Sequence, residues 1–127
     1  MSLEYIDWDI GDVTVINLSG RITLGEGTSR VRAAVREALA RGRKNLLLNL
    51  HDVFYLDSSG LGELVTLHTT VRKAGGHLKL MKLNELTRNL LTVSKLYTVF
   101  ETFADEQSAL ESFAAERPAA NPESGAG

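Results

Sequence analysis

The eighteen residues from Asn45 to Gly62 read NLLLNLHDVFYLDSSGLG, an apolar run followed by a polar turn that contains glycine. Asn45–Leu50 is apolar at nearly every position that packs, which is typical of a short strand covered on both faces. Asp57–Gly60 then supplies residues that favour a helix N-terminus and a tight turn. The stretch therefore predicts a central strand, a turn and a helix in direct succession.

The segment before this stretch predicts an antiparallel strand pair. Tyr5–Ile10 and Val13–Leu18 are rich in β-branched and aromatic residues, and Gly11-Asp12 between them is typical of a two-residue hairpin turn. A glycine-containing loop at 20–27 follows the second of these strands. We therefore expect the sheet to open with a hairpin.

A first helix is predicted after that loop, because apolar residues recur at helical spacing between Val31 and Leu39. Arginines and a glutamate take most of the intervening positions, and we interpret them as a solvated helix face. Thr28 or Ser29 is expected to cap this helix, and Gly42 to lie near its end.

The segment after the turn alternates helix and strand patterns. The second helix ends at Gly75-Gly76, and its apolar face consists of Leu61, Leu64, Val65, His68 and Val71. Leu67 falls beside that face, so we expect it to be only partly buried. The later elements are expected as a strand at His77–Met81, a helix at Glu85–Val93 entered from Asn84, a short strand at Tyr97–Phe103 and a last helix capped by Asp105.

Strands that alternate with helices predict a layered α/β domain whose later strands run parallel through right-handed crossovers. The opening hairpin makes the sheet mixed, with four to five strands. We expect one domain over residues 1–115, because a chain of 127 residues with 43% hydrophobic composition can build a single core. Residues 116–127 include no large apolar side chain, so we expect them to form a disordered C-terminal tail.

Composition and charge exclude several classes of partner and chemistry. A formal net charge of −2 and a pI near 5.9 give no basic surface for direct nucleic-acid binding or for an anionic membrane. The absence of cysteine excludes disulfides, thiolate catalysis and cysteine-ligated metals. Neither a signal peptide nor an apolar stretch of membrane-spanning length is evident, so we expect a cytoplasmic protein.

Residue spacing gives little support to an enzyme. A serine hydrolase built on Ser58 or Ser59 would need a glycine two residues before its nucleophile, and neither serine has one. Gly60-Leu61-Gly62 lacks the third glycine of a dinucleotide fingerprint, and no P-loop sequence occurs. The three histidines show no metal-ligand spacing. We therefore expect no catalytic residues, no cofactor and no metal site.

The Asp57–Gly60 turn allows two interpretations. Aspartate and serine are preferred capping residues and glycine relieves a tight turn, so a structural role is sufficient to explain them. Two hydroxyls and a carboxylate exceed what one cap needs, however, and the turn follows the carboxyl end of the central strand, where open α/β sheets place their sites. A helix N-terminus there also favours an anion such as phosphate.

The motif DSSGLG at 57–62, placed after the strand LLLNL and the spacer HDVFYL, resembles the acceptor motif of the STAS domain family. The hairpin end Leu18-Ser19-Gly20 and the later Ala74-Gly75-Gly76 fit the same family. The resemblance spans about residues 3 to 115, and is closest to the bacterial anti-sigma factor antagonists of sporulation and general stress in Gram-positive bacteria. It implies a STAS-like single domain with about four helices packed mainly on one side of the sheet.

The resemblance implies a partner switch controlled by phosphorylation. Ser58, directly after the aspartate, corresponds to the serine that is phosphorylated by an anti-sigma factor with serine kinase activity, and Ser59 is the neighbouring turn hydroxyl. The unphosphorylated antagonist binds the anti-sigma factor and releases the sigma factor, and a PP2C-type phosphatase reverses the modification. Asp57, with Gly60, Leu61 and Gly62, corresponds to the supports of the acceptor serine.

One loop departs from the family pattern. Many antagonists carry Gly-x-Leu-Asp after the second strand, whereas this chain has Gly20-Arg21-Ile22-Thr23 and no aspartate. That loop helps to form the partner surface in the family, so Arg21 and Thr23 are assigned to the partner-binding loop. The alternative within the family is a STAS scaffold in a larger signalling assembly or an accessory subunit of a lipid-transport ABC system, and neither needs a phosphoacceptor.

Overall fold

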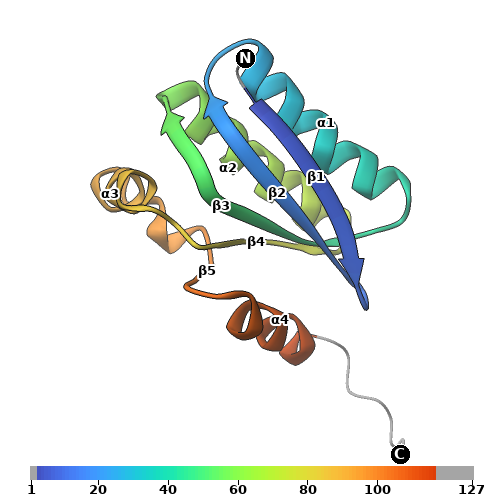
Figure 1. Ribbon diagram of the computed structural model, residues 1–127. Coiled ribbons are helices and arrows are strands. Elements are labelled where there is room, and N and C mark those ends of the chain that lie inside the picture. The colour runs from blue at the N-terminus through green and yellow to red at the C-terminus, as the bar shows by residue number, and fades with distance from the viewer. Residues whose placement is uncertain (1–2, 117–127) are drawn as a thin grey trace, which may run out of the picture.

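β1 (Leu3–Ile10) and β2 (Val13–Ile22) form the predicted antiparallel hairpin, with Ile10 paired to Val13 across its turn. The computed structural model describes residues 3–116, in which three further strands and four α-helices follow this hairpin (Figure 1). Of the predicted disordered tail at 116–127, all but Glu116 lies outside the described residues, and Glu116 is the C-cap of the last helix.

The sheet is mixed, as predicted, and its strand order is β1-β2-β3-β4-β5. β3 (Asn45–Leu56) pairs in parallel with β2 on one side and with β4 (His77–Met81) on the other, which confirms that it is the central strand. β5 (Thr102–Phe103) adds a short parallel edge to β4. The only antiparallel pairing within the described residues is the opening hairpin.

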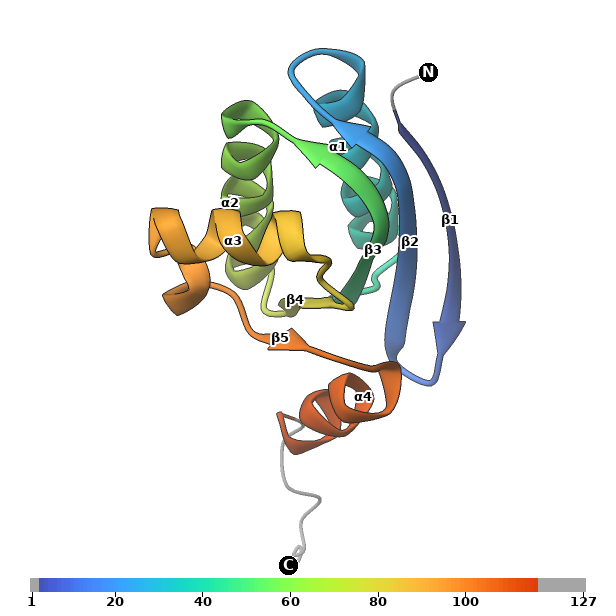
Figure 2. The same ribbon diagram turned by 60° about the vertical axis from the view of Figure 1, so that its left-hand side comes forward.

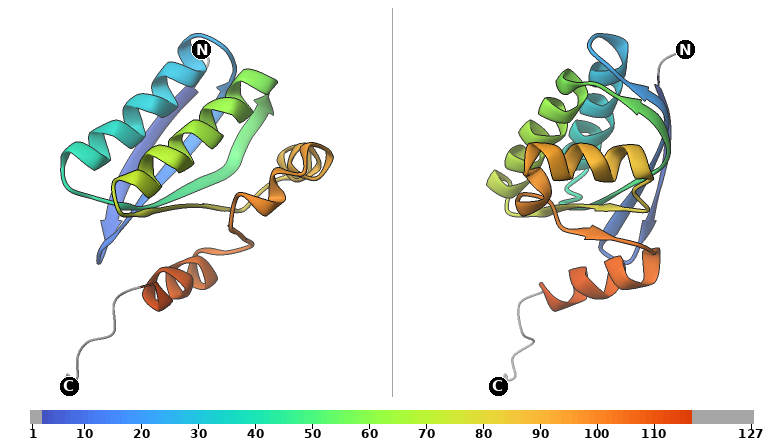
Figure 3. Two further views of the ribbon diagram at one scale, coloured as in Figure 1. Left: turned by 180° about the vertical axis from the view of Figure 1, so that it is seen from behind. Right: turned by 90° about the vertical axis from the view of Figure 1, so that its left-hand side faces the viewer.

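The helices are α1 (Glu26–Ala40), α2 (Ser58–Lys73), α3 (Glu85–Ser94) and α4 (Glu106–Ala115). α1 and α2 lie side by side across one face of the sheet, and α3 packs on the same core (Figure 3). α4 is separate from them and covers part of the other face (Figure 2). Helix packing mainly on one side is therefore confirmed. None of the helices within 3–116 combines the length and apolar character needed to span a bilayer.

The alternating side chains of β3 enter two cores. Leu46 and Leu48 belong to the large core beneath α1 and α2, whereas Leu47 lies with Phe113 in the small core beneath α4. All three leucines are fully buried, which explains why the strand is apolar on both faces.

β1 begins at Leu3 and β2 continues to Ile22, beyond their predicted bounds, and the two largest differences from the predicted strands are in β3 and β5. β3 continues past Leu50 to Leu56, because the end of β2 supplies its pairing partners and Leu56 lies opposite Ile22. The strand predicted at Tyr97–Phe103 is wrong over most of its length. Its first residues form a 3₁₀ turn, η1 (Leu96–Thr98), and only the two residues of β5 find partners on β4. Both differences depend on pairing between segments distant in sequence.

Helix α1 begins earlier than predicted. Its N-cap is Gly25, and Thr28 is the third helical residue, whose hydroxyl donates to the Gly25 carbonyl oxygen at 3.1 Å. Gly27 lies against β2 so closely that a Cβ atom there would be 2.6 Å from the Arg21 carbonyl oxygen. Contact with β2 thus accounts for glycine at position 27, whereas Gly25 has open space around it and has a φ of 104°, a conformation that favours glycine.

The prediction of partial burial for Leu67 is also wrong. Its side chain is 1% exposed and belongs to the large core, together with Leu64 and Val71 of the same helix. α2 packs against α1 and also against β4, so its buried face is wider than one stripe. His68, on the predicted apolar face, is half-buried, and its ring contacts the Phe100 ring edge-on at 5.4 Å between centroids.

A lysine holds α4 against the sheet. Lys79 of β4 is 1% exposed, and its Nζ donates to Ser112 Oγ at 2.9 Å and lies 3.2 Å from Glu116 Oε2. The same Nζ lies 3.3 Å from Glu101 Oε1 and 4.6 Å from the centroid of the Phe113 ring. Two carboxylates and an aromatic face therefore compensate the buried ammonium group.

Replacing Thr87 by valine is expected to stabilise the domain by about 1 kcal/mol. The Thr87 hydroxyl is buried and has no hydrogen-bond partner among the described residues, while its β-branched shape suits either side chain. Urea unfolding followed by circular dichroism measures the change. Thr92→Val, on an exposed position of the same helix, is the matched control and should change stability by less than about 0.5 kcal/mol. A loss of stability in Thr87→Val would mean that the hydroxyl is satisfied.

Candidate functional site

Asp57 is the N-cap of α2 and joins three segments. Its Oδ1 accepts a hydrogen bond from the Gly60 N–H at 2.7 Å, which caps the first turn of the helix. Its Oδ2 accepts from the Leu24 N–H at 3.2 Å, in the loop between β2 and α1. Its own N–H donates to the Ile22 carbonyl oxygen at 3.4 Å. The aspartate thus fixes the start of α2 against both the end of β2 and the loop that follows it.

Both serines of the motif lie inside the helix, rather than in the turn before it as the sequence predicts. Ser58 is the first helical residue and is exposed, whereas Ser59 is the second and is half-buried. Backbone N–H groups of a first helical turn have no intrahelical acceptor, and they form the positive end of the helix dipole. Ser58 therefore presents a hydroxyl to solvent at a position that tolerates negative charge.

The two glycines of the motif have different environments. A Cβ atom on Gly60 would overlap the Ile22 carbonyl oxygen and lie 2.7 Å from Leu56 Cδ1, so α2 contacts the end of β2 directly at this residue. Nothing lies within 4 Å of the equivalent position on Gly62. Leu61, between them, packs into the large core. Gly60 thus sets how close the start of α2, with Ser58, stands to the sheet, and Gly62 does not.

The loop that departs from the family pattern contacts Asp57 through Leu24. The Arg21 guanidinium lies over the Phe54 ring at 5.4 Å and over the Tyr55 ring at 5.8 Å from their centroids. Thr23 is half-buried, and its carbonyl oxygen accepts from the Thr28 N–H at 3.0 Å. Arg21 is therefore placed by the aromatic residues before the motif, and Thr23 by the start of α1.

Sequence reasoning missed three exposed apolar side chains around this site. Leu24 is 77% exposed, Phe54 60% and Tyr55 48%, and we call these three residues the apolar rim. Leu24 is tied to Asp57, and the two aromatic residues end the strand that leads into α2. Exposed apolar groups that gather in one place are a mark of protein interaction surfaces. Two adjacent aromatic residues at a strand end were the signal available in the sequence.

The histidines His51 and His68 lie in separate parts of the fold. His51 Nδ1 is 2.9 Å from Asp52 Oδ1 on the exposed part of β3. Burial, and then the charge of Arg72, holds the pKa of His68 below its usual range, on a helix face that packs against Phe100. Within residues 3–116, no three His, Asp or Glu side chains gather in a way suited to a metal ion.

Replacing Asp57 by alanine should destabilise the domain by about 2 kcal/mol, at the upper end for loss of an N-cap, because the Leu24 N–H also loses its acceptor. Asp105→Ala is the matched control. Asp105 caps α4 by accepting from the Ser108 N–H at 2.7 Å, and its loss should cost about 1 kcal/mol. Chemical denaturation of both variants measures the difference. Equal losses would show that the bond to Leu24 adds no stability.

Comparisons with known proteins agree with one another. The family model of the STAS domain matches residues 9–109. The anti-sigma F factor antagonist of Paenibacillus polymyxa is 27% identical over 99 residues, which cover 77% of this chain and 84% of that protein. The anti-sigma-B factor antagonist of Bacillus subtilis (strain 168) is 34% identical over 73 residues, which cover 58% of this chain and 67% of that protein.

Solved structures share the fold. The crystal structure of an anti-sigma factor antagonist from Mycobacterium paratuberculosis superimposes with a TM-score of 0.77 at 23% identity, covering 89% of this chain and 95% of that one. The phosphorylated form of the Bacillus cell fate determinant SpoIIAA gives a TM-score of 0.66 at 20% identity, covering 86% of this chain and 98% of that one. At these identities the likeness concerns the fold.

Proposed function

The chain belongs to the STAS domain family, and we propose that it acts as an anti-sigma factor antagonist whose binding is switched off by phosphorylation of Ser58. Its partners would be an anti-sigma factor with serine kinase activity and a PP2C-type phosphatase, both in the cytoplasm. In this proposal the chain is not an enzyme. It supplies the hydroxyl and the docking surface, and the kinase supplies ATP and its metal.

The observation that carries this proposal is the exposure of Ser58 at the first position of α2. A kinase must reach the acceptor hydroxyl, and this side chain is exposed, whereas Ser59 is half-buried. Asp57 and Gly60 hold the helix start against β2 at this point, so the hydroxyl has a defined position. Relatives named as antagonists of anti-sigma factors support the same assignment.

Charge explains how phosphorylation would act. A phosphoserine carries roughly −1.5 to −2 charges at neutral pH, and at Ser58 it would stand beside the Asp57 carboxylate. The first turn of α2 stabilises that negative charge within the folded domain, because its free N–H groups and the positive end of the helix dipole both lie at the helix N-terminus. A partner that covers the site would have to desolvate the phosphate. The modification thus blocks association without unfolding the domain.

The apolar rim supports a docking role for the same surface. Leu24 is hydrogen-bonded to Asp57, and Phe54 and Tyr55 lie near the end of β3, within four residues of Ser58, so we expect a partner that covers Ser58 to contact them as well. Aromatic side chains and arginine are enriched among residues that dominate binding energy, and Arg21 stacks on both rings. In this loop Thr23 stands where many antagonists carry the aspartate, and Arg21 adds a cation to the surface.

Phosphate mapping tests the proposal. The full chain is incubated with ATP and a serine-kinase anti-sigma factor encoded in the same genome, and modified peptides are identified by mass spectrometry. We expect one phosphate on Ser58, none on Ser58→Ala, and unchanged incorporation in Ser59→Ala. Phosphate on Ser59, or incorporation that persists in Ser58→Ala, would overturn the assignment. The lipid-transport or scaffold alternative would be favoured if the chain is never modified and if its gene lies next to permease genes.

A further inference from the structure

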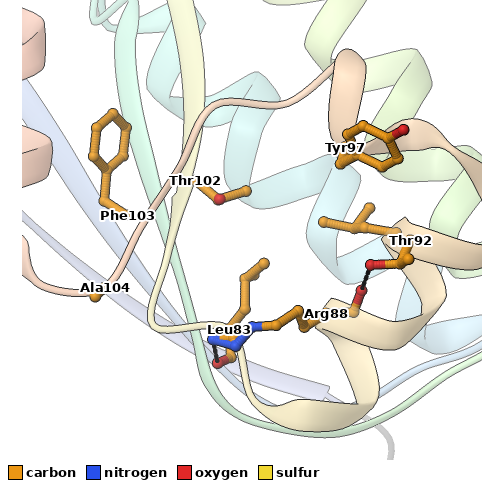
Figure 4. A pocket seen from close by; sticks show the side chains of 8 residues that line it. Leu83, Arg88, Thr92, Tyr97, Thr102, Phe103 and Ala104 are labelled. Atoms are coloured by element: carbon orange, nitrogen blue, oxygen red, sulfur yellow. Dashed lines mark hydrogen bonds between the residues drawn. The ribbon is translucent and has the colours of Figure 1, made fainter.

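A pocket of about 220 Å³ lies between α3, the η1 turn and β5, and none of its lining residues belongs to the Ser58 site (Figure 4). Leu83 follows β4 and Ala104 follows β5, so the pocket stands at the carboxyl ends of two parallel strands. Open α/β sheets bind small ligands in this position. The pocket is smaller than the 300–1,000 Å³ typical of drug-sized ligands, so it suits a small molecule.

The walls of the pocket combine apolar and polar groups. Leu83, Leu91 and the Tyr97 ring supply apolar surface, while Thr92 and Thr102 contribute hydroxyls. The Phe103 ring points away from the pocket and toward Lys79, whose Nζ lies 5.8 Å from its centroid (Figure 4). Space therefore remains on the α3 side of β5, lined mainly by apolar groups with a few polar ones at its edge.

Arg88 is the cation of this pocket. Its Nη2 donates to the Leu83 carbonyl oxygen at 3.1 Å, and no carboxylate lies within 4.0 Å of its guanidinium among the described residues. A guanidinium has five N–H donors in a planar fork, so most of them are free for a ligand. Thr92 Oγ1 donates to the Arg88 carbonyl oxygen at 3.0 Å, which fixes the hydroxyl beside the same turn of helix (Figure 4).

We propose that this pocket binds a small monocarboxylate with an apolar body. The carboxylate would pair with the Arg88 fork, and the apolar part would lie against Leu83, Leu91 and the Tyr97 ring. A single arginine matches one planar carboxylate, with two parallel N–H···O bonds. Apolar walls with one charged group that fixes orientation are the usual composition of small-ligand sites. This assignment does not depend on Ser58 or on its phosphorylation.

An NMR titration of the full chain with 3-phenylpropionate tests the proposal, because the probe joins a carboxylate to a compact apolar ring. We expect saturable shifts of backbone N–H signals concentrated between residues 83 and 104. 3-Phenylpropanol, with the same skeleton and no charge, should bind about tenfold or more weakly, because its hydroxyl cannot form the charge-assisted pair.

Variants of exposed arginines separate specific from general charge effects. Arg88→Gln should weaken 3-phenylpropionate binding about tenfold or more, whereas Arg36→Gln on the exposed face of α1 should leave it unchanged. No saturable shift with the acid would overturn the proposal. Equal affinity for the alcohol, or equal affinity of Arg88→Gln and the unaltered chain, would overturn it as well. The alcohol comparison uses the unaltered chain and so does not depend on the folding of any variant.

Discussion

Gly60→Ala is expected to destabilise the domain by about 3 kcal/mol, although alanine is the better helix former. The new Cβ would overlap the Ile22 carbonyl oxygen and lie 2.7 Å from Leu56 Cδ1. The first of these atoms is backbone in β2, and it accepts the hydrogen bond from the Asp57 N–H. Relief would require α2 to move away from the sheet. The gain in helix propensity is about 0.5–1 kcal/mol and is too small to compensate.

Gly62→Ala is the matched control, two residues along the same helix. Its Cβ would meet nothing within 4 Å, so only the propensity gain remains and stability should rise by about 0.5–1 kcal/mol. Urea unfolding followed by circular dichroism gives both free energies of unfolding. Opposite signs for the two variants are the expected result. If both glycines tolerated alanine equally, close contact between α2 and β2 would not be the reason for glycine at position 60.

Ser58→Asp is expected to weaken binding to the anti-sigma factor about 100-fold, because a partner that covers this position would have to desolvate a carboxylate beside that of Asp57, and each 1.4 kcal/mol is tenfold. The variant places a second carboxylate beside Asp57, within the surface formed by the apolar rim. Ser58→Ala should bind within about threefold of the unaltered chain and should stay bound when kinase activity and ATP are present. Isothermal titration calorimetry with the purified anti-sigma factor measures each affinity.

Ser108→Asp controls for the added charge. Ser108 is also exposed and lies in the first turn of a helix, but in α4, which covers part of the opposite face of the sheet. We expect its affinity for the anti-sigma factor to be unchanged. An acidic residue in a first turn is favourable for the helix, so neither aspartate variant should lose stability. Unaltered binding of Ser58→Asp, or an equal loss in Ser108→Asp, would contradict the proposed switch.

Local sequence patterns determined much of this fold. The leucines of β3 predicted a strand buried on both faces, and Gly11 predicted the hairpin turn. Asp105 predicted the cap of α4, because a capping bond joins residues three apart in sequence. The start of a helix close after Asp57 followed from the same kind of signal, although the serines lie inside α2 and not in a turn before it. These features depend on interactions between near neighbours, which a single sequence displays.

The tertiary structure decided where segments distant in sequence meet. β3 continues to Leu56 only because β2 lies beside it, and the predicted strand at Tyr97–Phe103 keeps only the two residues that pair with β4. Leu67 is buried because α2 packs against more than one element. Gly60 is required by a carbonyl group 38 positions earlier in the chain, and the Arg88 pocket is formed by α3 and β5 together. Such contacts have no local signature, because strand pairing and helix packing join residues whose separation in sequence is unrelated to their distance in space.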